Sequence, residues 1–465
     1  MNFLPLIAVA AVPLWLAACA TPAAPPAPAA TAPPGWYAPL PHGGALSNLT
    51  QWWQQFNDPL LVQLIESAQT ASPSIASARA RIEQVRAART AAGAALLPTF
   101  DGQASAARAN TPPARLTTTL QAGMQAGWEI DLFGGNAQAL RAAQSRLEAA
   151  QARWHDARVS VAAETANSYI NLRTCDRLRS VAENDARSRA ETARLADLTA
   201  QAGFTAPATA ALARASAAEA SVRTIQQAAL CDIEVKVLVE LSALPEPGLR
   251  EQLAQAWQEP PQAALLPPLS LPAQLLAQRP DVHQAERDVA AASADVGSAQ
   301  AQLYPRLSLS GSIAAGVVRI GGETAGAQTW SIGPLAVSLP LFDGGRRAAN
   351  VDAARARYDE AVALYAARAR LAVREVEQAL VSLESSRLRL ADARAASDGY
   401  RAVYLATEAR YRSGLGSLVE LEDARRSALV AQTQLVTLQR EQLSAWIALY
   451  RAIGGGWARP DAPSA

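Results

Sequence analysis

The chain has 465 residues and a net charge of +1, with 42 Lys and Arg against 41 Asp and Glu. This balance excludes an overall field that would attract nucleic acid or a strongly acidic partner. Half of the residues are hydrophobic, yet only 5% are aromatic, because alanine dominates the apolar residues. Alanine favours helices but buries little area per residue, so the composition indicates long packed helices rather than one large globular core.

The first residues are typical of a secreted lipoprotein precursor. Residues 4–16 form an apolar stretch of signal-peptide length, and Leu-Ala-Ala-Cys follows, ending at Cys19. Because this pattern is similar to a bacterial lipobox, we expect residues 1–18 to be a signal peptide and Cys19 to carry lipid, including palmitate; a free thiol is the alternative. Ala20 in place of an aspartate is compatible with the outer membrane. Residues 19–50 are expected to form a lipid-anchored linker.

The rest of the chain reads as two copies of one unit. An alternating run ends with Leu-Phe and glycines at Phe133 and again at Phe342, which are 342 − 133 = 209 residues apart. A similar shift aligns Pro98 with Pro305. Each copy predicts a helix, two strands and two long helices separated by a glycine, which indicates a duplicated domain. We place the first repeat at 51–245, the second at 246–453 and a tail at 454–465.

Helices are predicted from apolar residues that recur at steps of three and four, as in residues 282–303 and 362–390. This spacing is typical of a coiled-coil seam. Residues 136–200 contain no proline or glycine, so they predict one helix of roughly 100 Å. A helix of that length suits a tube that crosses the periplasm.

Four strands are predicted from alternating apolar and polar residues, at about 99–109, 117–133, 306–318 and 328–342. Gly333-Pro334 interrupts the last alternation and predicts a bulge. The strands are long enough for a membrane barrel, although a soluble half-buried sheet alternates in the same way. Four strands cannot close a barrel in lipid, so a membrane role requires several chains to share one barrel.

Several motifs, in their order along the chain, resemble one family. They are the lipobox at Cys19, WWQQFNDPLL starting at Trp52, QRPDV starting at Gln278, the Tyr304-Pro305 turn, LPLFDGG starting at Leu339, YRSGLGSLVELEDA starting at Tyr411 and ALYRAIGGGW starting at Ala448. The family is that of the TolC-like outer-membrane factors of tripartite efflux systems, in the NodT-type lipoprotein branch. The resemblance covers nearly the whole chain.

This resemblance implies a mainly α fold with a membrane β-barrel. A homotrimer would share a 12-stranded barrel, with four strands per chain, on a long α-helical barrel. The implied function is a passive export duct across the periplasm and outer membrane, for example for multidrug export. A periplasmic adaptor (membrane fusion) protein would couple it to an inner-membrane pump of the resistance–nodulation–division type, and outer-membrane lipid would surround the strands.

The resemblance also implies that the two glycine breaks are hairpin tips that meet the adaptor, with an ordinary helix–helix loop as the alternative. A turn with one small apolar side chain would let two hairpins mesh end to end. The matching tip residues are Ala202, Gly203, Phe204, Ser413, Gly414 and Leu415.

A pore gate is implied by the same motif. Tyr411, Glu420 and Asp423 match the tyrosine and the carboxylate ring of the family, and three copies would form rings of negative charge. Charges on a solvated helix are the alternative. The chain departs from the family at two positions: it has Gly416 where the family has an arginine, and Thr209 where the family has an acidic residue. We therefore expect the usual locking salt bridges to be missing.

Two cysteines flank the first tip symmetrically. Cys175 lies 203 − 175 = 28 residues before Gly203, and Cys231 lies 231 − 203 = 28 residues after it. They would face each other in a folded hairpin, and the periplasm is oxidising. We expect a Cys175–Cys231 disulfide, with two buried thiols as the alternative.

No catalytic, metal or cofactor site is predicted, so the chain is not expected to be an enzyme. His42, His155 and His283 lack partners at metal-ligand spacing, and neither a phosphate loop nor a nucleophile elbow occurs. No nucleic-acid partner is expected. The alternative function is a periplasmic lipid-anchored adaptor, a coiled-coil binding protein with one hairpin; two hairpins and four long strands favour the duct.

Overall fold

The computed structural model describes residue 37 and residues 49–110, 116–255, 279–320 and 322–457. The expected signal peptide, Cys19 and most of the expected linker and tail lie outside these residues. The described elements are, in chain order, η2 (Leu49–Phe56), α2 (Pro59–Ala71), α3 (Pro73–Ala94), β1 (Thr99–Ala109), β2 (Thr117–Ile130), α4 (Gly135–Gln201), α5 (Pro207–Ser242), α6 (Glu246–Leu253), α7 (Pro280–Ala301), β3 (Arg306–Ile320), β4 (Glu323–Ser338), α8 (Arg346–Arg412) and α9 (Leu418–Ala452).

The chain divides into two compact units. The strand unit contains the described parts of 78–153 and 283–368. The hairpin unit contains the described parts of 31–77, 154–282 and 369–465. Each unit therefore combines segments of both sequence repeats, because equivalent elements of the two copies pack beside one another.

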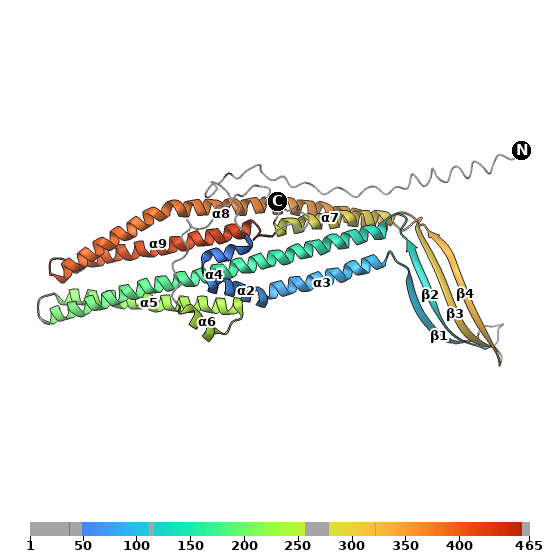
Figure 1. Ribbon diagram of the computed structural model, residues 1–465, viewed down its shortest axis with the longest axis horizontal. Coiled ribbons are helices and arrows are strands. Elements are labelled where there is room, and N and C mark those ends of the chain that lie inside the picture. The colour runs from blue at the N-terminus through green and yellow to red at the C-terminus, as the bar shows by residue number, and fades with distance from the viewer. Residues whose placement is uncertain (1–36, 38–48, 111–115, 256–278, 321, 458–465) are drawn as a thin grey trace. The chain divides into compact units, whose positions relative to one another are not determined.

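In the strand unit, the four strands form one antiparallel sheet in the order β1-β2-β3-β4 (Figure 1). Met124 of β2 lies opposite Ile313 of β3, which lies opposite Trp330 of β4. Since side chains alternate along a strand, these three apolar residues share one face of the sheet. Ser312 shares the other face with Ser331, and their hydroxyl oxygens lie 2.9 Å apart. The predicted division into an apolar and a polar face is confirmed.

Two of the predicted strands had wrong bounds. The strand expected at 117–133 ends at Ile130, because the Asp131 carboxylate instead accepts hydrogen bonds from the first turn of α4. The strand expected at 328–342 occupies Glu323–Ser338. It stops before Pro340, which has no N–H for the strand ladder. The predicted bulge at Gly333-Pro334 is confirmed by a register shift in the β3–β4 pairing at this position.

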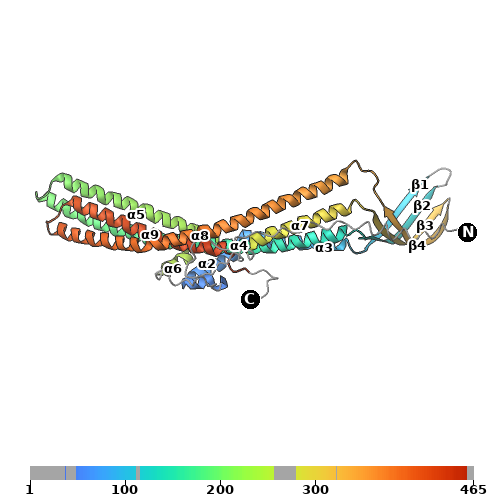
Figure 2. The ribbon, with the colours of Figure 1, turned by 90° about the horizontal axis from the view of Figure 1, so that it is seen from above.

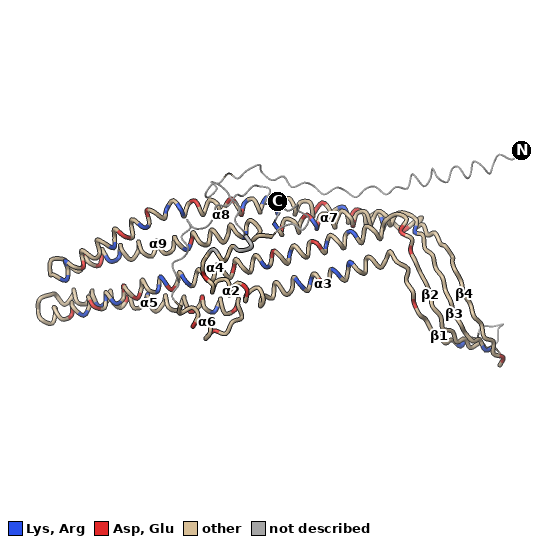
Figure 3. The backbone as a smooth tube through the Cα atoms, viewed as in Figure 1, with Lys and Arg blue, Asp and Glu red and all other residues tan. Residues whose placement is uncertain are grey.

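The sheet carries very little charge (Figure 3). Each charged residue within the strands lies within three positions of a strand end. They are Asp101, Arg108, Glu129, Arg306, Arg319 and Glu323. The middle of the sheet is therefore free of the groups that are costly to bury in hydrocarbon.

The two long helices begin in equivalent ways. Asp131 accepts hydrogen bonds from the amides of Asn136 (3.1 Å) and Ala137 (2.7 Å) at the start of α4. Asp343 accepts from the amides of Gly345 (3.0 Å) and Arg347 (3.2 Å) at the start of α8. A carboxylate at this position satisfies amides that have no partner within the helix. Both helices are 67 residues long.

The length and hydropathy of the helices bear on whether any of them could span a membrane. Among the described residues, no helix is both long enough and apolar enough to pass through a membrane.

Candidate functional site

Helices α4 and α5 form one hairpin of the hairpin unit, and its turn is closed by main-chain bonds. The Phe204 amide donates to the Thr199 carbonyl at 2.9 Å, and the Gly203 amide donates to the Ala200 carbonyl at 3.0 Å. This pair of bonds defines a Schellman motif, which requires a left-handed residue. Gly203 supplies it with a φ of +78°, so the predicted tip is a specific helix-terminating turn.

Helices α8 and α9 form a second hairpin with the same turn. The Leu415 amide donates to the Arg410 carbonyl at 2.8 Å, and the Gly414 amide donates to the Tyr411 carbonyl at 3.0 Å. Gly414 has a φ of +73°. The two tips lie side by side in both views of the ribbon (Figures 1 and 2).

Each tip presents one large apolar side chain to solvent. In a Schellman motif, the residue after the glycine usually packs against the residue five positions before it. Here these earlier residues are the polar Thr199 and Arg410, so that packing is absent at both tips. Phe204 is 85% exposed and Leu415 is 73% exposed. The neighbouring Ala202 and Ser413 are also exposed.

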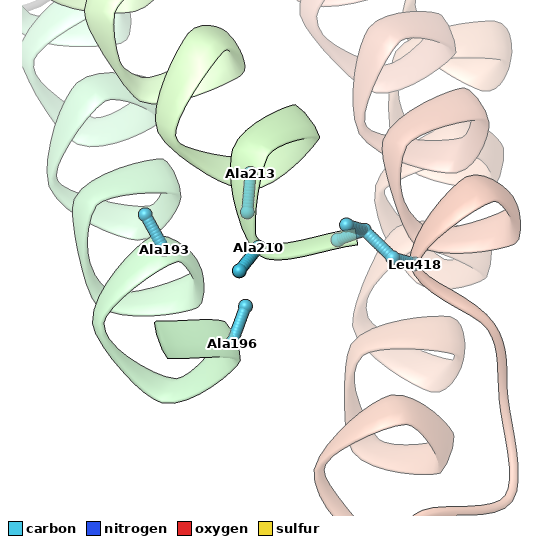
Figure 4. Packing of buried hydrophobic residues seen from close by; sticks show 5 residues of the cluster. All are labelled: Ala193, Ala196, Ala210, Ala213 and Leu418. Carbon is cyan, nitrogen blue, oxygen red and sulfur yellow. The ribbon is translucent and has the colours of Figure 1, made fainter. Parts of the chain in front are cut away.

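Close to the tips, the two hairpins pack through small side chains (Figure 4). Leu418 of α9 packs against an alanine layer of the first hairpin, and Tyr411 lies partly buried against the same cluster. Burial raises the pKa of the Tyr411 hydroxyl above its ordinary value. The alanine layer consists of Ala193, Ala196, Ala210 and Ala213.

The other two predicted gate residues lie away from this layer. Glu420 is exposed and forms a capping box with Ser417: the Glu420 amide donates to Ser417 Oγ at 3.1 Å, and the Ser417 amide donates to Glu420 Oε2 at 3.3 Å. Asp423 is exposed and lies 3.6 Å from Arg426 of the same helix. Within one chain, the structure therefore does not bring Tyr411, Glu420 and Asp423 together.

A buried group of charged residues instead joins the hairpins, and the motif comparison missed it. Its centre is formed by Arg189 of α4 with Glu422 and Arg425 of α9, whose side chains are 8%, 12% and 3% exposed. The apolar spacing contained a signal. Leu418, Leu421 and Arg425 follow one another at steps of three and four, which places Arg425 on the packed face of α9.

The first hairpin also contains a covalent link. Cys175 of α4 and Cys231 of α5 form a disulfide, with Cα atoms 5.5 Å apart and sulfur atoms 2.12 Å apart. The distance between the two Cα atoms lies within the usual range for disulfides. The pair is the one that the symmetric spacing about Gly203 predicts.

The two described histidines have ordinary surroundings. The His155 ring contacts Trp154 edge-on at 4.7 Å between centroids, and His283 is buried. His42 lies outside the described residues. Across the part of the chain that the structure describes, no three His, Cys, Asp or Glu side chains are grouped so that they could hold a metal ion.

Comparison with known proteins agrees with this arrangement. The profile of the family described as outer membrane efflux protein matches residues 64–242 and 271–455. The solvent efflux pump outer membrane protein SrpC of Pseudomonas putida is 29% identical over 414 residues, covering 87% of each chain. Nodulation protein T of Rhizobium leguminosarum bv. viciae is 30% identical over 431 residues, covering 90% of this chain and 86% of that protein.

A solved structure shows the same architecture. The crystal structure of the Campylobacter jejuni CmeC outer membrane channel superposes with a TM-score of 0.85 at 26% identity, covering 94% of this chain and 96% of that one. Together with the family match, this likeness favours the channel over the adaptor alternative. The chain therefore belongs to the outer membrane efflux protein family, and it is the outer-membrane component of a tripartite efflux system.

Proposed function

We propose that three copies of the chain form a passive export duct whose 12 strands close into one barrel. The observation that carries this proposal is the open sheet: β1 and β4 each pair with only one strand among the described residues. Unpaired strand edges are not tolerated in lipid. Pairing β4 of one copy with β1 of the next satisfies both edges, and the number three comes from the family.

The duplicated strand–helix junction supports this pairing. Phe133, at the end of the first copy's strand pair, stacks on Tyr304 with ring centroids 5.0 Å apart. Its counterpart Phe342 is 92% exposed. In the repeat, Tyr304-Pro305 corresponds to Leu97-Pro98, and Leu97 is also exposed. If neighbouring copies repeat the internal contact, Phe342 covers Leu97 of the next copy.

A cysteine pair tests the shared barrel. The variant Leu97→Cys with Phe342→Cys should form oxidant-dependent dimers and trimers in outer membranes, as seen on non-reducing gels. In the matched control, Phe133→Cys with Tyr304→Cys, the pair lies within one chain and should give only monomers. If the Leu97→Cys/Phe342→Cys protein is found in the outer membrane and is exclusively monomeric after oxidation, the shared barrel is contradicted.

We also propose that the hairpin tips bind the hairpins of a periplasmic adaptor. Support comes from the two exposed apolar side chains, Phe204 and Leu415. Each directly follows the left-handed glycine, Gly203 or Gly414, of a turn with the same hydrogen bonds. Ala202 and Ser413 complete the small contact surface. An exposed aromatic or aliphatic residue on a rigid turn is a suitable anchor for a partner surface. Phe204→Ser together with Leu415→Ser should weaken co-purification of the adaptor without reducing the amount of channel.

For the gate, we propose that Glu420 and Asp423 of three copies face a common pore beside Tyr411. Their exposure within one chain is compatible with this position, and rings of carboxylates favour cations. The variant Glu420→Gln with Asp423→Asn should lower the cation selectivity measured from reversal potentials across planar bilayers. An unchanged selectivity would place these carboxylates outside the pore.

The remaining parts of the proposal concern anchoring and energy. Lipid on Cys19 would hold the mature chain at the outer membrane, and Cys19→Ser should abolish metabolic labelling with palmitate. Energy would come from an inner-membrane pump, of the resistance–nodulation–division type, since the proposed duct performs no chemistry of its own. Drug accumulation should rise when either the pump or this chain is deleted.

A further inference from the structure

We propose that Arg108 of β1 and Arg319 of β3 bind a phosphate group of a lipid in the outer leaflet of the outer membrane. This inference rests on the proposed duct, in which the apolar face of the sheet contacts lipid. It assigns a specific lipid-binding site to a face that otherwise only has to be apolar.

Strand register places the two arginines in one row across the sheet. Arg108 lies opposite Thr118 of β2, and Thr118 lies opposite Arg319. Residues that lie directly opposite each other on neighbouring strands share one face of a sheet. Arg108 and Arg319 therefore flank Thr118, with their Cα atoms about 9.5 Å apart, which is two strand spacings. These three residues are called the arginine row.

The arginine row lies on the apolar face of the sheet. Thr118 is 124 − 118 = 6 residues from Met124 on β2, and Arg319 is 319 − 313 = 6 residues from Ile313 on β3. Since side chains alternate along a strand, an even separation keeps residues on the same face. Both arginines are exposed, so their guanidinium groups are accessible on the side that the proposed duct turns to lipid.

The other charged residues of the strands lie on the polar face. Each is in a row with Ser312, or with a β3 residue an even number of positions from Ser312. They are Asp101, Glu129, Arg306 and Glu323, which lie opposite Gln125, Ser308, Ser338 and Ile320. Among the strand residues, the apolar face therefore carries two charges, and both are positive.

The arginine row also lies at one border of the apolar band. Along β2, Thr118 is 128 − 118 = 10 residues from Trp128, which is about 33 Å of strand. With a strand tilt of about 40°, this length gives a height of about 25 Å, the height of the apolar band of a membrane barrel. Trp128 is thus placed at one membrane interface and the arginine row at the other.

The position of the helices identifies which interface this is. Helix α3 precedes β1 and helix α4 follows β2, so both adjoin the sheet at its Trp128 end (Figure 1). The protein is located in the outer membrane and extends into the periplasm. The Trp128 end therefore faces the periplasm, and the arginine row faces the outer leaflet, at the depth of the lipid headgroups.

The chain itself supplies no counter-charge for these arginines on the lipid side. Every acidic residue of the strands lies on the polar face, and the connections at 110–116 and 321–322 contain no Asp or Glu. Basic side chains at a membrane border are attracted to anionic lipid. A guanidinium matches a phosphate especially well because it donates two parallel hydrogen bonds. Two arginines on either side of the Thr118 hydroxyl therefore form a site for one phosphate group.

The variant Arg108→Gln with Arg319→Gln tests this site, because it removes both guanidinium groups and keeps long polar side chains at the border. Purified full-length protein in detergent is titrated with phosphorylated lipid A and with dephosphorylated lipid A. We expect the unmodified protein to bind the phosphorylated form about tenfold more tightly, and the variant to bind both forms equally. Arg108→Lys with Arg319→Lys keeps the charge but not the paired hydrogen bonds, so it should keep part of the preference.

The matched control is Arg306→Gln. It removes an arginine of the same strand, β3, but from the polar face and the opposite border, so the preference for phosphorylated lipid A should remain. Inorganic phosphate at the concentration of the lipid should not compete, which distinguishes a lipid headgroup from a free anion. Circular dichroism checks that each variant is folded.

Three results would overturn the site: an undiminished preference in the folded glutamine variant, equal binding of both lipids by the unmodified protein, or the same loss in Arg306→Gln. Displacement by an equal concentration of inorganic phosphate would overturn the assignment to lipid. The duct is judged separately, by the cross-link between positions 97 and 342. If that cross-link fails, the titration still decides the site, because the whole arginine row lies within one chain.

Discussion

The two helical hairpins come from equivalent parts of the repeat and end in the same turn, yet they are stabilised differently. The first hairpin has the Cys175–Cys231 disulfide, and the start of α5 at Ala206 has no side-chain cap. The second hairpin has no cysteine, and α9 starts with the Ser417 capping box. One hairpin is thus fixed by a covalent bond far from its tip and the other by polar contacts at its tip.

This difference indicates which hairpin can move. A disulfide between two antiparallel helices prevents them from sliding or separating, so the first hairpin should behave as a rigid body. The second hairpin contacts the first through the Arg189–Glu422 ion pair and through hydrogen bonds of Arg425, and it contains no disulfide. We therefore expect the α8/α9 hairpin to make the larger movement when the channel opens.

Removing the disulfide, which distinguishes the first hairpin from the second, should cause the largest change in unfolding free energy. Cys175→Ser with Cys231→Ser releases a link that closes 56 residues, which corresponds to about 4 kcal/mol of unfolding free energy. Urea unfolding of the purified protein, followed by circular dichroism, measures the loss. Reduced unmodified protein should match the variant; equal stability of the oxidised protein and the variant would show that the bond contributes nothing.

A second disulfide should make the hairpins alike. Positions 414 − 28 = 386 and 414 + 28 = 442 correspond to the native cysteines, and both Ser386 and Gln442 are buried. Ser386→Cys with Gln442→Cys should add about 2 kcal/mol of stability when oxidised. It should also reduce channel opening in bilayers, reversibly with reductant. An oxidised variant that opens normally would show that α8 and α9 move as one rigid pair.

Exchanging the caps should have a smaller effect. Ser417→Ala removes the side-chain acceptor for the Glu420 amide and should cost about 1 kcal/mol. Ala206→Ser should stabilise the start of α5 by a similar amount. Hydrogen exchange at the first amides of α5 and α9 reports both changes; protection that moves in the same direction in the two variants would contradict the assignment.

The smallest expected effect is the loss of folding stability at acidic pH. Burial, and secondarily Arg158, lowers the pKa of His155 on α4 below the ordinary 6.5. The unfolded chain then binds more protons than the folded chain, so stability should fall as pH decreases from about 6.5 through the lower folded-state pKa. His155→Gln should remove this part of the acid sensitivity in unfolding experiments between pH 7 and pH 5. An identical pH profile for the variant would exclude His155 as its source.

Much of this architecture could be predicted because it depends on local patterns. The spacing of apolar residues identified the helices and strands, and Gly203 and Gly414 marked the turns because only glycine adopts their backbone conformation freely. The strand ends were harder to predict. Pro340 and Asp131 each continue an alternating pattern while changing the hydrogen bonds available to the main chain.

The gate shows where pattern and motif become insufficient. Glu420 and Asp423 were singled out because they match a motif, yet within one chain they are exposed. Glu422 lies between them in sequence and was passed over, although it is the residue that contacts Arg189. The helical spacing is a weak signal, because Glu422 follows Leu418 by four residues, yet each of these acids could face water on an isolated helix.

The sequence by itself determined the repeated unit, the identity of its elements and the positions of its turns, since these follow from spacing and from backbone preferences within a few residues. Only the tertiary structure decided which charged groups are buried. Burial of an ion depends on a partner from a distant segment, as Arg189 is separated from Glu422 by 233 residues, and that pairing exists only once the two hairpins lie together.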